Sequence, residues 1–199
     1  MVAVSGSAKD NKAHKIVRAM MMTNRQKRIG VMTGFGVVAT LIALGLIYPR
    51  VIFLRQRRVC TENLRQIGLG SRMWSHDSSD DIAPSLEALN GYLTNSRCYV
   101  CPGSGHAPGP MNAIQAWTDY GFVSGGKESD PPAGVLAFCP PSHHGGKGAL
   151  VLYGDLTVRW LSVPEFARIT NDPVLLFGTG DRTQLDELRK RRRIINPIQ

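Results

Sequence analysis

The chain has 199 residues, which is enough for one domain and an appendage but too few for two large domains. Hydrophobic residues make up 43% of it and charged residues 20%, which excludes both a disordered chain and a polytopic membrane protein. The formal net charge is +9, and this charge is distributed unevenly along the sequence.

Positive charge gathers in three segments, whereas the middle of the chain is acidic. Residues 1–30 carry seven basic residues and one Asp (+6), residues 50–72 six Arg and one Glu (+5), and residues 182–199 six basic and two acidic residues (+4). Residues 73–181 carry five basic and eleven acidic residues (−6). This arrangement argues against a basic nucleic-acid-binding domain and favours a protein placed at a membrane surface.

An uncharged apolar stretch covers residues 31–48, after the basic N-terminal tail at residues 1–30. A helix of this length spans about 27 Å, close to the ~30 Å hydrocarbon core of a bilayer. Apolar residues continue to Leu54, so we expect a single transmembrane anchor at residues 31–54. Arginines on both flanks favour this interpretation over a buried core helix. The long basic region and the absence of a small-x-small cleavage pattern favour it over a signal peptide.

The basic residues also predict an orientation for the anchor. Slightly more of them precede the apolar stretch than follow it, which favours a cytoplasmic N-terminus. We therefore expect a single-pass protein of the cell inner membrane, with its soluble domain on the periplasmic, extracytoplasmic side.

The soluble domain is predicted at residues 55–181. Cys60, Leu64 and Ile67 recur at helical spacing, so the helix of the anchor should continue to about Ser75 and pack on the body along this stripe. A further short helix is expected at residues 85–89.

In the second half of the soluble domain, the sequence predicts first loops and then strands and a helix. Residues 94–141 are rich in Gly, Pro and Ser, which is typical of loops with short strands. Residues 149–153 and 156–161 predict a β-hairpin with Asp155 in its turn, and residues 162–165 predict a capping box that opens a helix. The fold class expected from these elements is α+β.

Residues 182–199 predict a basic C-terminal helix and tail. A helix start near Thr183 leads into a run of cations, which suits the C-terminal end of a helix. Such a run is usually solvated, and its functional interpretation is contact with an acidic subunit or with lipid headgroups. The residues concerned are Arg189, Lys190, Arg191, Arg192 and Arg193.

The four cysteines leave three interpretations open. Outside the cytoplasm Cys60, Cys98, Cys101 and Cys139 could form disulfides, in pairings that the sequence does not fix. Alternatively, zinc could bind the set Cys98, Cys101, Cys139 and His143, with His106 and His144 as spare ligands. The third interpretation is free buried thiols. We expect no other cofactor.

Cys139 together with His143 or His144 also has the composition of a thiol hydrolase. No recognisable nucleophile motif surrounds it, however, and the sequence contains no glycine motif for phosphate or dinucleotide binding. The sequence therefore predicts a protein that is not an enzyme.

Two motifs resemble the pilin-like proteins that are abundant in planctomycetes. Residues 60–69 read CTENLRQIGL, close to the family's C-x-x-N-L-[RK]-Q-I-G-L, and Cys101 is followed by Pro102 as in many members. Near the end, His144-Gly145-Gly146 is followed by an apolar strand, by Asp155, and by a second strand that includes Trp160. The resemblance implies a long N-terminal helix packed on a small antiparallel sheet, secretion or membrane anchoring, and no catalytic activity.

The chain departs from this family in two places. The apolar helix begins Gly34-Phe35 but lacks the glutamate that members use for assembly into a pilus, and Leu156 stands where members have glycine. We therefore expect a non-catalytic accessory subunit that scaffolds a larger integral-membrane complex, for example a respiratory or photosynthetic one. The alternatives are a minor pilin or pseudopilin of a type II secretion or type IV pilus system, and a membrane-tethered zinc or thiol protein.

Overall fold

The computed structural model describes residues 8–179 and 182–195, with side chains from residue 40 onward apart from residues 182, 185, 193 and 195. Its contacts separate an N-terminal unit that ends at Val51 from a body that begins at Ile52. Helix α1 (Ala8–Asp77) contributes residues to both. Residues 31–39 of the predicted anchor and the predicted basic tail lie outside the described side chains. Among the described residues, no helix combines the length and the apolar character needed to cross a membrane.

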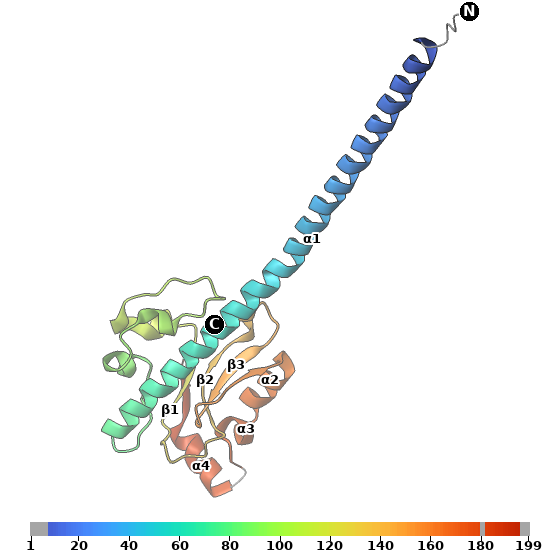
Figure 1. Ribbon diagram of the computed structural model, residues 1–199. Coiled ribbons are helices and arrows are strands. Elements are labelled where there is room, and N and C mark those ends of the chain that lie inside the picture. Colours follow the sequence, from blue (N-terminus) through green and yellow to red (C-terminus); the bar gives the residue numbers. More distant parts are fainter. Residues whose placement is uncertain (1–7, 180–181, 196–199) are drawn as a thin grey trace, which may run out of the picture. The chain divides into compact units, whose positions relative to one another are not determined.

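The body contains a five-stranded sheet in the order β4-β3-β2-β1-β5 (Figure 1). All neighbouring strands pair in antiparallel fashion. The strands are β1 (Gly121–Ser124), β2 (Val135–Cys139), β3 (Ala149–Tyr153), β4 (Val158–Leu161) and β5 (Arg193–Ile195). The prediction of an α+β fold with a small antiparallel sheet is thereby confirmed.

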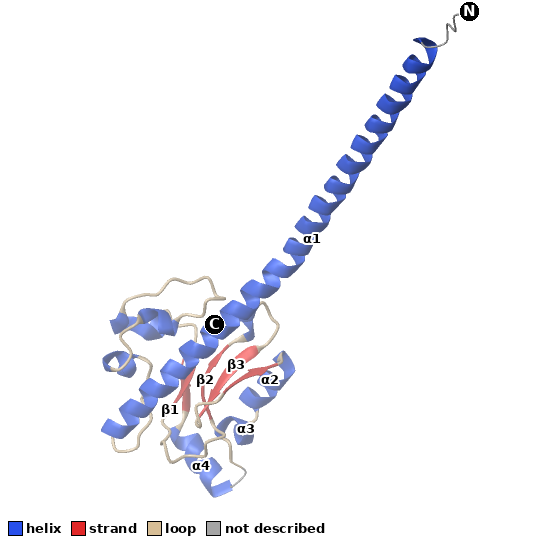
Figure 2. Cartoon of the chain, viewed as in Figure 1, coloured by secondary structure: helices blue, strands red, loops and turns tan. Residues whose placement is uncertain are grey.

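The C-terminal part of α1 covers one face of this sheet (Figure 2). Cys60, Leu64 and Ile67 are fully buried there, which confirms the predicted stripe. They share a core with sheet residues such as Phe122 and Leu152. The helix is therefore held to the body by apolar side chains that recur on one of its faces.

Three helices cover the opposite face of the sheet. The sequence predicted the first and the last of them, but not that they form a layer on this face. They are α2 (Val163–Asn171), α3 (Pro173–Phe177) and α4 (Arg182–Arg191). Their buried residues Phe166, Leu176, Phe177 and Leu188 form a second core with Val123, Val135, Phe138, Ala149 and Val151 of the strands. The body is thus a three-layer structure, with helices on both faces of the sheet.

The predicted hairpin is formed by β3 and β4, which pair from Ala149↔Leu161 to Leu152↔Val158. In its turn Asp155 accepts hydrogen bonds from the backbone N–H and the hydroxyl of Thr157, at 2.9 and 2.6 Å. The hydroxyl contact is the main reason that the pKa of Asp155 lies below its ordinary value.

Leu156, which follows Asp155, has a positive φ of 65°, a conformation that glycine adopts more readily. A Cβ built on Gly68 would lie only 2.8 Å from Cδ2 of Leu156, so this leucine rests against α1 where the helix has no side chain. Its packing offsets the backbone strain and explains how the turn accommodates a leucine in place of glycine.

Two smaller predictions are also resolved. The backbone N–H of Ser162 donates to Oε2 of Glu165 at 2.8 Å, and the resulting capping box opens α2 as expected. Four short 3-10 helices lie between α1 and β3, and the first of them overlaps the helix predicted at residues 85–89. They are η1 (Glu87–Gly91), η2 (Ser96–Tyr99), η3 (Met111–Ala116) and η4 (Pro141–His144).

The packing of α1 predicts a sharp difference between two of its leucines. Leu64 is fully buried, whereas Leu69 is 53% exposed on the same helix. Leu64→Ala should lower the free energy of unfolding by about 2–5 kcal/mol, because it removes buried methylene groups and leaves a cavity. Leu69→Ala should change it by less than about 0.5 kcal/mol. Chemical denaturation of both variants tests this, and equal effects would contradict the packing of α1 on the sheet.

Candidate metal centre

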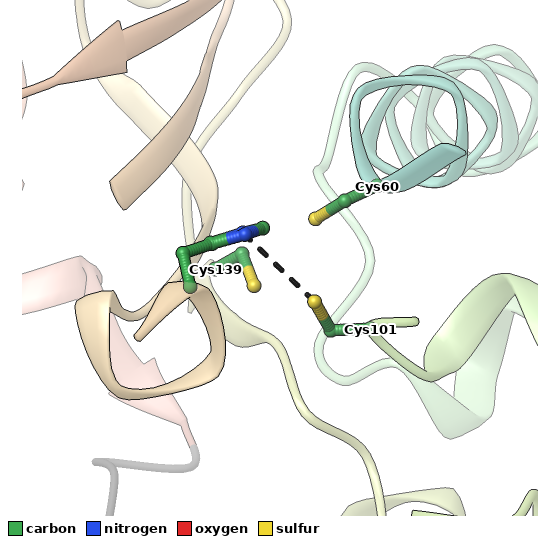
Figure 3. Close-up of side chains that lie close together, drawn as sticks. Cys60, Cys101 and Cys139 are labelled. Carbon is green, nitrogen blue, oxygen red and sulfur yellow. Dashed lines mark hydrogen bonds between the residues drawn. The ribbon is translucent and has the colours of Figure 1, made fainter. Parts of the chain in front are cut away.

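Four metal-ligating side chains meet between α1 and the sheet: Cys60, Cys101, Cys139 and His144. They come from α1, from the loop after η2, from the end of β2 and from the end of η4. Figure 3 shows the three cysteine side chains pointing toward one another from these separate elements. The cluster therefore joins segments that lie far apart in the sequence.

Local structure explains how the two loops reach this point. Asn95 caps η2 by accepting a hydrogen bond from the backbone N–H of Arg97 at 3.1 Å, just before the chain reaches Cys101. Gly103 allows the same loop to approach η4, because a Cβ at this position would lie 2.1 Å from the backbone oxygen of His143. The chain then leaves η4 through Gly145, which has a positive φ of 63°.

The geometry of the cluster suits a tetrahedral metal ion. The four ligand atoms all lie within 4.8 Å of one another, and Sγ of Cys101 lies 3.9 Å from Nε2 of His144. Ligand atoms around a tetrahedral zinc ion are separated by about 3.5–3.8 Å, given the usual zinc–sulfur and zinc–nitrogen distances. The cluster could thus hold a metal such as zinc after a small contraction.

The pKa shifts of the three thiols also favour a bound metal ion. Hydrogen bonds from the thiols of Cys139 and then Cys60 hold the pKa of Cys101 well below its ordinary value. The hydrogen bond to Cys101 raises the pKa of Cys60, and burial raises that of Cys139. Without a cation the site favours a single thiolate, because further negative charge in a buried place is unfavourable. A divalent cation would balance the charge of all three sulfurs.

The structure brings together two of the four predicted ligands. Cys101 and Cys139 belong to the cluster, but Cys98 and His143 do not, and Cys60 and His144 take their places. The thiol of Cys98 instead donates to Oε1 of Gln66 at 2.5 Å. Cys98 lies inside η2, whereas Cys101 follows the extended residue Val100, so the two sulfurs of the C-x-x-C pair point to different surroundings.

His143 lies next to the cluster without joining its four ligand atoms. Its Nδ1 is 3.8 Å from Sγ of Cys139, and its Nε2 is 3.8 Å from Oδ1 of Asp119. His144, the next residue, points inward, is 3% exposed and packs edge-to-face against Trp160 at 5.3 Å between ring centroids. His144 was foreseen only as a spare ligand.

The sequence indicated that Cys60 is buried, but it was not predicted as a metal ligand. Cys60 begins the apolar stripe of α1, so a buried position was expected for it. What the spacing did not show was which loop residues would face that stripe.

Disulfides, one of the three interpretations of the cysteines, are not formed in the structure. All four cysteines are free thiols, and all are buried. Three of them gather around a common point instead of forming pairs, which is the arrangement that metal coordination requires.

The basic run at residues 189–193 was predicted to contact a partner or lipid. Arg189 and Lys190 are exposed on α4 and fit that interpretation. The backbone of Arg193 belongs to β5, and its side chain lies outside the described residues. The segment is therefore largely part of the body rather than a separate tail.

For Arg192 the prediction is wrong. Its guanidinium is buried, lies 3.3 Å from Oδ2 of Asp130, and donates to the backbone oxygen of Val135 at 3.3 Å. Arg191 contacts the other oxygen of Asp130 at 3.2 Å. A buried guanidinium paired in this way is not available to a partner or to lipid headgroups.

Comparison of the chain with protein-family models, with curated proteins and with solved structures gave no match. The resemblance to pilin-like proteins therefore rests on the motifs in the sequence.

The ligand assignment predicts opposite results for two buried cysteines. Cys60→Ser should weaken zinc binding strongly, because it removes one of four ligands, whereas Cys98→Ser should retain wild-type zinc content. His144→Gln should weaken zinc binding strongly for the same reason as Cys60→Ser. Metal analysis of the purified variants measures this. Zinc loss on Cys98→Ser with retention on Cys60→Ser would contradict the assignment.

Proposed function

We propose that the chain is a non-catalytic, membrane-anchored accessory subunit whose body is held together by a structural zinc ion. In this role it scaffolds a larger integral-membrane complex, for example a respiratory or photosynthetic one. The observation that carries the proposal is the buried Cys3His cluster, in which four protein ligands converge. Sites of this kind are typically structural, since catalytic zinc keeps one position open for water or substrate.

The position of the thiols also supports a role without catalysis. Cys139, His143 and Asp119 follow one another in the order of a cysteine-hydrolase triad. The thiol of Cys139 is 0% exposed, however, and burial raises its pKa, whereas a catalytic cysteine needs an accessible thiolate. This arrangement is better suited to holding a metal than to attacking a substrate.

A zinc ion at this place would fasten α1 to the sheet and to the loop-rich middle of the chain. Between η1 and β2 the body contains only short 3-10 helices and one four-residue strand, so this segment has few regular backbone hydrogen bonds. Metal ligation commonly supplies stability where the hydrophobic core is small. In an extracytoplasmic compartment, bound zinc would also keep the three thiolates from oxidising.

Membrane anchoring is supported by the apolar surface of α1 before the body begins. The large side chains of Leu41, Ile42, Leu44, Leu46 and Ile47 are each more than half exposed. Such a continuous apolar surface is unfavourable in water and favourable in lipid. Together with the arginines that follow it, this surface supports a single-pass anchor in the inner membrane with a cytoplasmic N-terminus.

A second candidate, a minor pilin or pseudopilin, is favoured by one observation. The C-terminal part of α1 packs along an antiparallel sheet through Cys60, Leu64 and Ile67, the arrangement that the resemblance implies. The missing glutamate after Phe35 weakens this candidate, because that residue mediates assembly in the family.

Purification from native membranes in mild detergent distinguishes the two candidates. An accessory subunit should be recovered with integral-membrane partners in constant proportion, with equimolar zinc, and with the residues before Phe35 retained in the mature chain. Pilus or secretion components together with an N-terminus at Phe35 would favour the pseudopilin. Recovery of the chain alone would contradict the accessory role.

Removal of zinc predicts a loss of stability. A ligand at a free concentration of about 1,000 times its Kd adds about 4 kcal/mol to the free energy of unfolding. A chelator should therefore lower the Tm of the full chain in detergent, and added zinc should restore it. Cys60→Ser should not respond to either treatment. An unchanged Tm after verified zinc removal would contradict a structural role for the metal.

A further inference from the structure

A buried carboxylate lies beside the cysteine cluster. Asp119 comes just before β1, and its side chain is 2% exposed. The backbone N–H of Cys101 donates to Oδ2 of this residue at 2.8 Å, and the hydroxyl of Ser104 donates to the same oxygen at 2.5 Å. The other oxygen, Oδ1, lies 2.7 Å from Nδ1 of His106. These neighbours offset the unfavourable burial of a carboxylate.

The same carboxylate also reaches a second cysteine of the cluster through a histidine. Oδ1 of Asp119 lies 3.8 Å from Nε2 of His143, whose Nδ1 lies 3.8 Å from Sγ of Cys139. Asp119 is thus linked to Cys101 through the backbone and to Cys139 through one imidazole ring. These two cysteines come from different elements, the loop after η2 and the end of β2.

We propose that Asp119 is a positioning residue of the metal centre. It fixes the loop of Cys101 through the backbone N–H and holds His143 against the sulfur of Cys139. Both effects set the thiols in place before the metal arrives. This inference rests on the proposed function, since it assumes that the cluster holds zinc.

Two features assign Asp119 to this role rather than to metal ligation. The four atoms that lie within 4.8 Å of one another are three sulfurs and an imidazole nitrogen, and no oxygen of Asp119 is among them. Its oxygens are already engaged by the N–H of Cys101, by Ser104 and by His106. Partners that orient metal ligands typically contribute about 10- to 100-fold to metal affinity.

His106 provides a matched control. It contacts the same carboxylate, but its side chain is 64% exposed. Its ring meets that of His143 edge-on at 6.2 Å between centroids, and it is not a member of the ligand cluster. Removing it should leave the two links from Asp119 to the cysteines in place.

The test compares zinc affinity by competition with a chelating dye, using the full chain in detergent. Asp119→Asn and His143→Gln should each weaken zinc binding by about 10- to 100-fold while the bound stoichiometry is retained. His106→Ala should weaken it by less than about threefold. The double variant Asp119→Asn/His143→Gln should lose less zinc affinity than the product of the two single fold-losses. Both residues act on Cys139 along one path, so their effects are not independent.

Cobalt substitution provides a readout that a general loss of stability would not change. The thiolate-to-cobalt absorption bands of Asp119→Asn should keep their tetrahedral character but shift in energy, whereas those of His106→Ala should match the wild type. If Asp119→Asn does not fold, His143→Gln decides the question, because it leaves the bonds of Asp119 to Cys101 and Ser104 intact.

Three outcomes would overturn the inference. The first is wild-type affinity in both Asp119→Asn and His143→Gln, and the second is an equal loss in His106→Ala. The third is full additivity in the double variant. In all three the wild type still binds zinc, so the proposed function stands. A wild type that binds no zinc would contradict the proposed function and this inference together.

Discussion

The body is organised around one constraint. Three sulfur atoms and an imidazole nitrogen lie together in a buried site between α1 and the sheet. Cys60 places this point on the helix, and Cys139 places it at the end of β2. Cys101 and His144 bring in two loops that have little other regular structure. Such a place favours one thiolate but opposes a second and a third, so a bound cation would make the arrangement favourable. A metal ion held there would join α1, β2 and the two loops.

The elements with strong local signals could be predicted from the sequence. The stripe of Cys60, Leu64 and Ile67, the hairpin around Asp155 and the capping box at Ser162 each depend on residues within a few positions of one another. Local spacing was sufficient because the physical cause of each element is itself local.

The parts that escaped prediction depend on contacts between distant residues. The burial of Arg192 depends on Asp130, which lies far from it in the sequence, so a run of cations gave no sign of it. The choice of Cys60 over Cys98 as a ligand depends on which loop faces α1. Likewise, the second layer rests on single apolar residues such as Phe166 and Leu188, which are too few in their short helices to form a clear pattern.

The position of β5 in the sheet has a consequence for the order of folding. Strand β5 pairs with β1 but is formed by Arg193–Ile195, which leave the ribosome after the other four strands. All four ligands of the cluster precede residue 145, and strands β1 to β4 end at Leu161, so both are synthesised before α4 and β5. Until β5 has been made, β1 is an open edge of the sheet. During synthesis the residues of the ligand cluster are therefore complete early, whereas the β1 edge of the sheet is covered late. Before β5 covers it, a chaperone or a neighbouring chain can pair with this edge.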